Sequence, residues 1–497
     1  MWQYKYQGID RANATITAIE AMEAFKNESD PDNKTLRGYV SEAKFLRAFL
    51  AFDLIKYWGD VPFKTEASDD YQGAYQPRKD RELIYDQIID DLNYAKENLD
   101  WATASSSPER ITQGAARALL MRVYLQRAGY SLGVLKNTGK LTIPSDDTRK
   151  TYFNAVIKEW EAFQQGGYHN FYDGGYKELF KSFSAGTLNS KESLWEIAFF
   201  TVSGDKEDAG TWGTYIGQRV DASSGVSSTE VMGRANAFFQ VVPAWYDFYE
   251  DQDARRDVAI STTFYYWNKV KKEHTEAPYY KYKMTSGVED QDANGDLIPT
   301  KNPPVVNRAN YTPGKWRREW MPIGYKDPNN VDVNYCVLRY ADVVLMAAEA
   351  YNETGNTGEA WNLLNEVRRR AGATEINSSN YAEFYKAPKV YDLVAEDGSM
   401  IIDDSNEAGK FRTALYWERG LELAFEGQRK YDLIRWGILD KVLKVFGKQD
   451  TDHNTAKADA YPAYKNFVSG QHELFPIPLE ELQINNKITD QNPGYTR

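Results

Sequence analysis

The sequence predicts a mostly α-helical protein, with a core of helical hairpins like those of tetratricopeptide repeats and a large irregular excursion of loops and short strands. Three observations predict this fold. Both ends of the 497-residue chain place apolar residues at helical spacing. Several of these helices are paired through short turns, with small residues where the two helices cross. The middle of the chain changes to β-prone segments between polar loops. We therefore expect one domain over residues 1–497, with a helical core at about 1–165 and 338–497 and an excursion at about 166–337.

The first long helix is predicted within residues 37–58. Its apolar residues recur every three or four positions, at Tyr39, Ala43, Leu46, Leu50, Leu54 and Tyr57. A row of Phe residues beside this face widens it, which indicates a helix covered on two sides. Gly59 and Pro62 are expected to end the helix.

Three more helices are predicted in the N-terminal third, at about residues 80–99, 112–128 and 152–164. The helix at 112–128 places three alanines among larger residues, so a neighbouring helix can approach closely. The helix at 152–164 is expected to stop at Gly166 and Gly167, because glycine readily ends helices.

The C-terminal part returns to helical hairpins. Residues 339–372 predict two helices with a turn at 354–357, and residues 413–437 predict another pair broken around Gly427. In the excursion, the segments "SLWEIAFFTV" and "STTFYYWNKV" favour strands. Long irregular segments in a compact protein are commonly functional, so we expect this region to carry ligand specificity.

The chain closes on "ELFPIPLEELQINNKITDQNPGY", which is too rich in large apolar residues for a frayed tail. Residues before proline favour extended backbone, and Pro478 suits the first position of a short helix. Asn485 and Asn486 are predicted to stop this helix in the left-handed conformation. Residues 492–495 predict a type II turn. We expect an ordered strap that lies on the body of the protein.

Composition excludes several classes of function. The net charge of −12 argues against a nucleic-acid partner, which would need clustered Lys and Arg. No apolar run of about 18 residues predicts a membrane-spanning helix. The single cysteine, Cys336, is expected to be a small buried residue, and the four histidines have no zinc-ligand spacing. Aromatic residues make up 14% of the chain, which suits half-exposed contact surfaces.

Several stretches together resemble the SusD/RagB family of surface nutrient-binding proteins. The stronger matches, in the family's order, are Glu42–Phe63, Leu338–Asn356, Glu418–Gly437 and the closing residues 474–495; the weaker ones are Lys191–Phe200 and Pro243–Asp257. The resemblance implies a glycan ligand, delivery to a SusC-like TonB-dependent outer-membrane transporter, and lipid anchoring at the outer-membrane cell surface in Bacteroidetes. Members normally begin with a lipoprotein signal peptide, whereas "MWQYKYQGIDRANATI" resembles an internal part of the pattern.

Two motifs suggest catalysis, and each has a structural interpretation that we favour. "GYSLG" (Gly129–Gly133) matches a nucleophile elbow, but a helix precedes it where the motif needs a strand, so Gly129 is expected to be a helix end. Charged residues recur along the C-terminal helices and could supply the two carboxylates of a glycosidase. The favoured interpretation is buried ion pairs that hold the helices in register; these residues are Arg339, Asp342, Glu349, Glu418, Arg419, Glu422, Glu426 and Arg429.

A calcium loop is possible at "DQDANGD". Asp290, Asp292, Asn294 and Asp296 offer oxygens at alternate positions, but Lys301 stands where a bidentate Glu belongs. A plain turn is the favoured interpretation, so no metal or cofactor is assigned.

Aromatic residues in polar loops are the candidate glycan contacts, because sugars present flat C–H faces that can lie on exposed rings. Asp70 and Arg78 are candidate partners for sugar hydroxyls. The complete candidate set is Trp212, Tyr71, Tyr75, Trp267, Tyr215, Asp70, Arg78 and Trp320, with Trp316 a weaker candidate.

We therefore expect a non-catalytic glycan-binding protein. Two alternatives remain open: an α-helical glycoside hydrolase, and a helical-repeat scaffold that binds protein partners. Release of reducing sugars would favour the hydrolase. Buried loop aromatics and a lack of binding to any carbohydrate would favour the scaffold.

Overall fold

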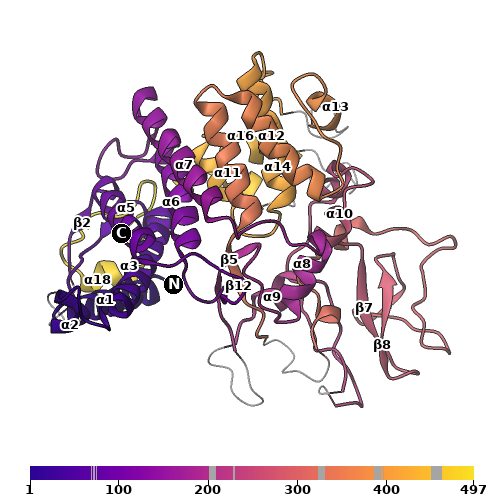
Figure 1. The fold of residues 1–497 in the computed structure, drawn as a ribbon. Coiled ribbons are helices and arrows are strands. Elements are labelled where there is room, and N and C mark those ends of the chain that lie inside the picture. The colour runs from indigo at the N-terminus through magenta and orange to yellow at the C-terminus, as the bar shows by residue number, and fades with distance from the viewer. Residues whose placement is uncertain are drawn as a thin grey trace.

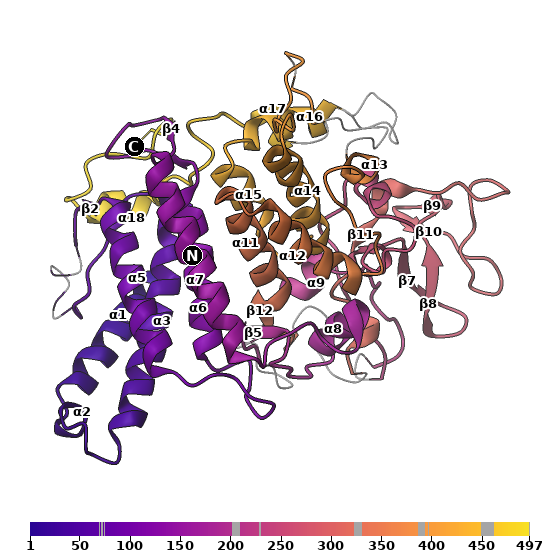
Figure 2. The same cartoon turned by 45° about the horizontal axis from the view of Figure 1, so that its top comes forward.

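The computed structural model describes residues 1–68, 70, 73, 75–200, 209–227, 230–322, 331–385, 393–395, 397–448 and 462–496. Its long helices stand side by side in a row, with the N-terminal helices at one end (Figure 1). The excursion lies at the other end of the row, beyond the C-terminal hairpin (Figure 2). The predicted fold class, a mostly helical hairpin core with an irregular excursion, is confirmed.

The N-terminal end of the row is built from α1 (Trp2–Glu20), α2 (Glu23–Lys26), α3 (Asn33–Trp58), α5 (Arg81–Asn98), α6 (Gln113–Ala128) and α7 (Asp146–Gly166). Helix α3 packs against both α1 and α5, and α6 packs against α7. The small residues predicted at a close crossing, Ala115, Ala116 and Ala118, are fully buried in α6. Helix α3 ends at Gly59, which adopts a φ of 74° that side chains disfavour.

One expectation for α3 is wrong. Tyr39 and Leu46 belong to the predicted buried face, but they are 48% and 39% exposed. They line a groove of about 850 Å³ between α1, α3 and the strand residue Trp195. The helical spacing identified the apolar face correctly, but no helix among the described residues covers Tyr39 and Leu46.

The C-terminal hairpins form the middle of the row, and the helix pairs predicted within residues 339–372 and 413–437 are both present, the second beginning six residues earlier than expected. The elements are α11 (Tyr340–Glu353), α12 (Thr357–Arg370), α13 (Tyr381–Tyr385), α14 (Glu407–Glu422), α15 (Arg429–Arg435), α16 (Leu439–Lys448) and α17 (Pro462–Asn466). Helix α11 contacts α12, α14, α6 and α7, so it lies at the centre of the core. Gly427 separates α14 from α15 with a φ of 79°.

The excursion consists of short helices and two-stranded antiparallel sheets. Its longer sheets pair β5 (Ser193–Ile197) with β12 (Tyr335–Arg339), and β7 (Thr263–Asn268) with β8 (Glu273–Pro278). Its helical segments are α8 (Gly175–Ser184), α9 (Trp212–Ile216), η1 (Pro243–Phe248), α10 (Arg256–Ala259), η2 (Arg308–Asn310) and η3 (Arg318–Trp320). Strand β12 continues directly into α11, so the β5–β12 pair connects the excursion to the core.

The remaining strands, two residues each, also pair antiparallel. They are β1 (Val61–Pro62) with β2 (Arg78–Lys79), β3 (Ser131–Leu132) with β4 (Leu141–Thr142), β6 (Ile260–Ser261) with β11 (Thr312–Pro313), and β9 (Met284–Thr285) with β10 (Val288–Glu289). The first pair closes the loop that follows α3.

The C-terminal strap, residues 474–495, lies on the body of the protein as predicted, and it crosses the end of α3. The indole N–H of Trp58 donates to the Pro476 carbonyl at 3.0 Å, and the Phe475 N–H donates to the Tyr57 carbonyl at 2.8 Å. A Cβ on Gly59 would lie 2.9 Å from Leu474 Cδ1, so the close crossing requires glycine. The strap then forms the short helix α18 (Leu479–Ile484).

The predicted end of α18 needs correction. Asn485 caps the helix in an extended conformation, with φ −96° and ψ 92°, and not in the left-handed one. The reason is tertiary: its buried side-chain amide donates to the Gln76 carbonyl at 3.1 Å, which holds the residue against the loop after α3. The turn at 492–495 is present, with the Tyr495 N–H donating to the Asn492 carbonyl at 3.2 Å.

Asn492 provides a test of the strap's contribution to stability. Its buried amide donates to the carbonyls of Trp58 and Phe475 at 3.0 and 2.7 Å and accepts from Arg78. We expect Asn492→Ala to lower the free energy of unfolding by about 2–3 kcal/mol, because buried partners lose their hydrogen bonds. Urea unfolding measures this change. Asn486→Ala, at an exposed strap position, is the matched control and should leave the urea midpoint unchanged.

Candidate functional site

The backbone around α9 is held by β-type contacts beyond the β5–β12 pair. Gly210 and Val331 form an antiparallel bridge with both N–O distances at 2.8 Å, and α9 begins two residues later. Ala237 donates to the Thr214 carbonyl at 3.3 Å, and Phe238 donates to the Tyr215 carbonyl at 2.7 Å. The segment after Ala235 therefore lies along α9.

This segment exposes two aromatic rings that the sequence analysis missed. Phe238 is 61% exposed and Phe239 is 58% exposed. The ring of Tyr215 meets the ring of Phe238 edge-on, with centroids 5.1 Å apart. Arg234 and Gln240, both exposed, flank the pair in sequence. We call Tyr215, Phe238 and Phe239 the aromatic surface; adjacent Phe residues within the polar stretch "RANAFFQ" were the signal that could have indicated it.

Trp212, three residues before Tyr215 on α9, is half-buried and held by interior contacts. Its indole N–H donates to the Val333 carbonyl at 3.0 Å, and its ring packs edge-on against Trp316 at 4.3 Å and Tyr335 at 5.3 Å. Trp316 is buried. Trp212 therefore fixes the position of α9.

The other predicted tryptophans are placed elsewhere. Trp267 is only 5% exposed, and its ring packs edge-on against His274 at 5.0 Å. Trp320 is half-buried, with the Arg317 guanidinium 5.0 Å from its ring centre. Neither side chain contacts Trp212 or Tyr215, so the structure does not bring the predicted aromatic residues together in one site.

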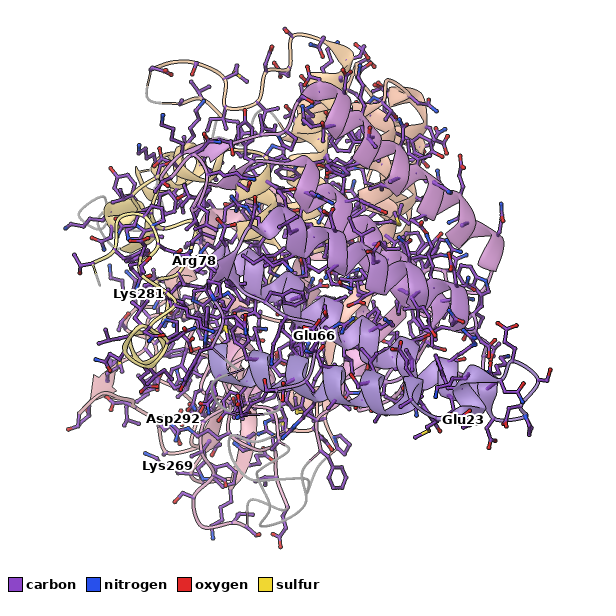
Figure 3. All side chains as sticks on the ribbon, turned by 90° about the vertical axis from the view of Figure 1, so that its left-hand side faces the viewer. Glu23, Glu66, Arg78, Lys269, Lys281 and Asp292 are labelled. Atoms are coloured by element: carbon purple, nitrogen blue, oxygen red, sulfur yellow. The ribbon has the colours of Figure 1, made fainter. Side chains whose placement is uncertain are left out.

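The candidates after α3 lie near the strap, away from α9 in Figures 1 and 2. Asp70 and Tyr75 line a pocket of about 860 Å³, and Asp70 Oδ1 accepts from the Gly73 N–H at 2.6 Å. Tyr71 lies outside the described residues. Arg78 lies beside the strap (Figure 3), where it donates to the Asp60 and Asp490 carbonyls at 2.7 and 3.2 Å and to the Asn492 side chain. The guanidinium of Arg78 thus anchors the strap.

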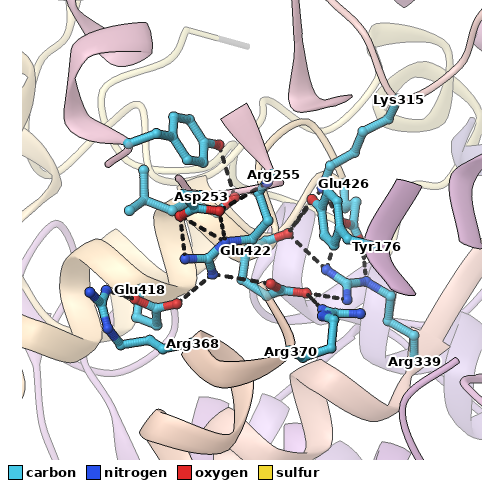
Figure 4. A network of polar contacts seen from close by, with 12 residues as sticks. Tyr176, Asp253, Arg255, Lys315, Arg339, Arg368, Arg370, Glu418, Glu422 and Glu426 are labelled. Atoms are coloured by element: carbon cyan, nitrogen blue, oxygen red, sulfur yellow. Dashed lines mark hydrogen bonds and ion pairs between the residues drawn. The ribbon is translucent and has the colours of Figure 1, made fainter. Parts of the chain in front are cut away.

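The charged residues of the C-terminal helices form a buried ion-pair network (Figure 4). Arg339 donates to Glu422 and Glu426 at 2.6 Å each and to Glu192 at 3.2 Å. Arg255 contacts Glu418 and Glu422, and all of these side chains are buried. The network joins the excursion to α14 and β12, which supports the structural interpretation.

The electrostatics of this network do not suit a glycosidase acid, which needs a raised pKa. Burial alone would raise the pKa of the Glu422 carboxyl, but the charges of Arg370, Arg339 and Arg255 outweigh it and hold that pKa well below its ordinary value. Burial does raise the pKa of Glu196, in β5. Its side chain is only 3% exposed, however, and donation from Asn334 at 3.0 Å ties it to the interior.

The remaining motifs also have structural roles. Gly129 caps α6, and the structure places a helix before "GYSLG", so the context of a nucleophile elbow is missing. Asp292 Oδ1 accepts from the N–H groups of Asn294 and Asp296 at 2.8 and 3.0 Å, as expected of a turn.

The described part of the chain offers neither a metal site nor a membrane-spanning helix. No group of three or more His, Cys, Asp or Glu side chains there is placed to hold a metal ion. Nor does any helix in those ranges combine the length and apolar character needed to cross a bilayer.

Comparisons with known proteins indicate one family over nearly the whole chain. A sequence model described as "SusD family" matches residues 191–495, and one described as "Starch-binding associating with outer membrane" matches residues 1–125. The chain is 26% identical to "SusD-like protein P25" of Formosa agariphila, over 99% of this chain and 79% of that protein.

Solved structures show the same likeness. A SusD homolog from Bacteroides thetaiotaomicron is 30% identical and superposes with a TM-score of 0.75, over 99% of this chain and 85% of that one. A protein described as "Laminarin binding SusD-like protein" is 24% identical with a TM-score of 0.60, over 99% and 85% of the two chains. At that identity the likeness shows the fold alone.

Proposed function

The chain belongs to the SusD family, and from this premise we propose that it binds a glycan, without cleaving it, at the aromatic surface formed by Tyr215, Phe238 and Phe239. Trp212 anchors α9, the helix that carries Tyr215. A saccharide is the proposed ligand class because the laminarin-binding neighbour has the same fold. The proposal extends to delivery of the glycan to a SusC-like TonB-dependent transporter and to lipid anchoring at the outer-membrane cell surface, for which the family description of residues 1–125 gives support.

The observation that carries the proposal is the exposure of two neighbouring Phe rings. Large apolar side chains that gather on a surface mark a site of interaction. A sugar can lie with its C–H face on such rings, while its hydroxyl groups reach polar side chains such as Arg234 and Gln240. Phe rings offer no hydrogen bond of their own, so the flanking polar groups would determine the orientation of the sugar.

Several features support binding without hydrolysis. The carboxylates of the C-terminal helices are bonded to guanidinium groups in the buried network. Glu196, whose pKa is raised, is only 3% exposed and accepts a hydrogen bond from Asn334. The exposed rings of Phe238 and Phe239 offer a surface to a glycan, whereas the burial of Trp267 and Trp316 is what the scaffold alternative expects, so carbohydrate binding itself separates these two functions.

Migration of the protein through native gels, each cast with one polysaccharide, tests this function. We expect retardation by at least one polysaccharide and a loss of that retardation in Phe238→Ala and Phe239→Ala. Each change should weaken binding at least about tenfold, since covering a Phe ring contributes about 1.5–3 kcal/mol.

Tyr4→Ala is the matched control, because Tyr4 is 74% exposed on α1 and lies in neither hollow described above. It should migrate like the unchanged protein. Full retardation of both Phe variants would rule out the aromatic surface as the binding site, and release of reducing sugar from the retarding polysaccharide would rule out the non-catalytic role.

A further inference from the structure

The strap pocket is a cavity of about 860 Å³ enclosed by three parts of the chain that are distant in sequence. The first turns of α1 form one wall, the end of α3 with the loop after it forms another, and α18 of the strap forms the third. Its volume lies in the range of small-molecule sites. It is distinct from the aromatic surface, whose residues do not line it.

Aromatic side chains form one side of the strap pocket. The rings of Trp2 and Trp58 meet edge-on with centroids 5.1 Å apart, and Tyr6 packs against Trp2 at 4.9 Å. Hydrogen bonds hold two of these side chains: Tyr6 Oη donates to the Pro62 carbonyl at 2.8 Å, and Trp2 Nε1 donates to Glu481 Oε2 at 3.3 Å. The wall is therefore fixed before any ligand arrives.

The strap also fixes the loop that carries Tyr75. Lys487 Nζ donates to the Tyr75 carbonyl at 2.7 Å, and Asn485 donates to the Gln76 carbonyl at 3.1 Å. A pocket whose walls are held in this way loses little conformational freedom on binding, which favours affinity.

The charges that line the strap pocket are strongly unbalanced. Its lining side chains supply four carboxylates and one ammonium group; these are Asp10, Asp70, Glu480, Glu481 and Lys64. Within the described ranges, no Lys or Arg forms an ion pair with any of the four carboxylates. Two of them accept backbone N–H groups: Asp10 from Ser68 at 2.9 Å and Asp70 from Gly73 at 2.6 Å. The lining thus carries negative charge and many hydrogen-bond acceptors.

We propose that the strap pocket is a second saccharide-binding site, and that its carboxylates restrict it to sugars without negative charge. Hydroxyl groups of a neutral sugar can donate to the carboxylates while its C–H face lies near Tyr6, the half-buried ring of the wall. Trp2 and Trp58 are only 7% and 5% exposed, and Trp2 packs against Tyr6. A uronate or sulfate group would be repelled by the net charge of the lining. The ligand class rests on the proposed function, whereas the location of this site does not.

Hydrogen exchange measured by mass spectrometry tests the proposal on the full chain. The probes are neutral hexasaccharides of glucose and mannose and the hexamers of galacturonate and mannuronate, each titrated at low ionic strength. We expect at least one neutral hexamer to slow exchange in peptides covering residues 58–68 and 477–488. The charged hexamers should need at least about tenfold higher concentration to slow exchange to the same extent, and added salt should reduce this difference in concentration.

Variants separate the strap pocket from the aromatic surface. Gln7 is an exposed residue of α1 that lines the strap pocket, so Gln7→Trp places a bulky ring in the pocket. This variant should lose the protection from hydrogen exchange that the neutral hexamer gives. Thr17→Trp, exposed on the same helix outside the pocket, is the control and should keep it. Protection should persist in the Phe238→Ala/Phe239→Ala double variant even where gel retardation is lost.

Three results would overturn the proposal. They are no protection by any neutral hexamer, protection that survives Gln7→Trp, and equal protection by charged and neutral hexamers. None of these bears on the aromatic surface, which the gel experiment tests separately.

Discussion

Replacing Arg339 with methionine is expected to lower the free energy of unfolding by about 3–5 kcal/mol, the largest effect of any single substitution considered for this chain. Arg339 is 2% exposed and donates to three carboxylates, on Glu192, Glu422 and Glu426. Methionine fills a similar volume but carries no charge. The change therefore leaves buried carboxylates with fewer donors, and a buried charge without its partner is costly.

Urea unfolding followed by tryptophan fluorescence measures this loss. Arg369→Met is the matched control, because Arg369 pairs with Glu375 at 2.9 Å but its side chain is 61% exposed. Exposed pairs contribute little, so the control should stay within about 0.5 kcal/mol of the unchanged protein. Arg339→Lys keeps the charge but not the forked geometry, and we expect an intermediate loss. A loss below about 1 kcal/mol in Arg339→Met would show that the network does not hold the excursion to the core.

The helical core could be predicted because its signals are local. Apolar spacing, small residues at the α6 crossing and glycine at the helix ends lie within a few residues of the elements they determine. Gly59, Gly167 and Gly427 all adopt positive φ where helices were predicted to stop. The expectation that Tyr39 and Leu46 are buried failed because spacing shows which face of a helix is apolar, not whether another element covers it.

The candidate site was less predictable because contacts between distant residues decide it. Trp212 was predicted to be an exposed ring. In the structure it contacts Val333 and Trp316, which lie more than one hundred positions further along the chain. Arg78 was predicted to bind sugar hydroxyl groups. In the structure it donates a hydrogen bond to Asn492 of the strap. Phe238 is exposed because its backbone follows α9, and no local pattern in the sequence specifies that path.

Electrostatics of the same core predict a marked loss of stability in acid. Burial would raise the pKa of Asp342, but the charges of Arg122 and Arg419 outweigh it and hold the pKa below its ordinary value of 3.8. For Asp432, Arg419 and Arg435 likewise outweigh the effect of burial. Together with Glu422, these groups stay ionised in the folded state at pH values where the unfolded chain already binds protons.

The sign of the pH dependence follows from these depressed pKa values. Their stabilising contribution is complete at neutral pH, begins to fall as pH drops through the ordinary values of 3.8 for Asp and 4.5 for Glu, and continues to fall toward the folded pKa values. Each group contributes about 1.4 kcal/mol for each unit by which its pKa is depressed. Between pH 5 and pH 3, three such groups should therefore remove several kcal/mol from the free energy of unfolding.

Urea midpoints measured at steps from pH 7 to pH 3 test this prediction. We expect a nearly constant midpoint above about pH 5.5 and a steep decline below about pH 4.5. Salt at roughly 0.5 M screens interactions between exposed charges. Because the three carboxylates are buried, the same salt concentration should leave the fall of the urea midpoint in acid unchanged. Glu375→Gln, which removes the exposed partner of Arg369, should reproduce the unchanged profile. A urea midpoint that stays constant down to pH 3 would contradict the depressed pKa values. If salt abolishes the fall of the midpoint, surface charges and not the buried carboxylates cause the loss of stability.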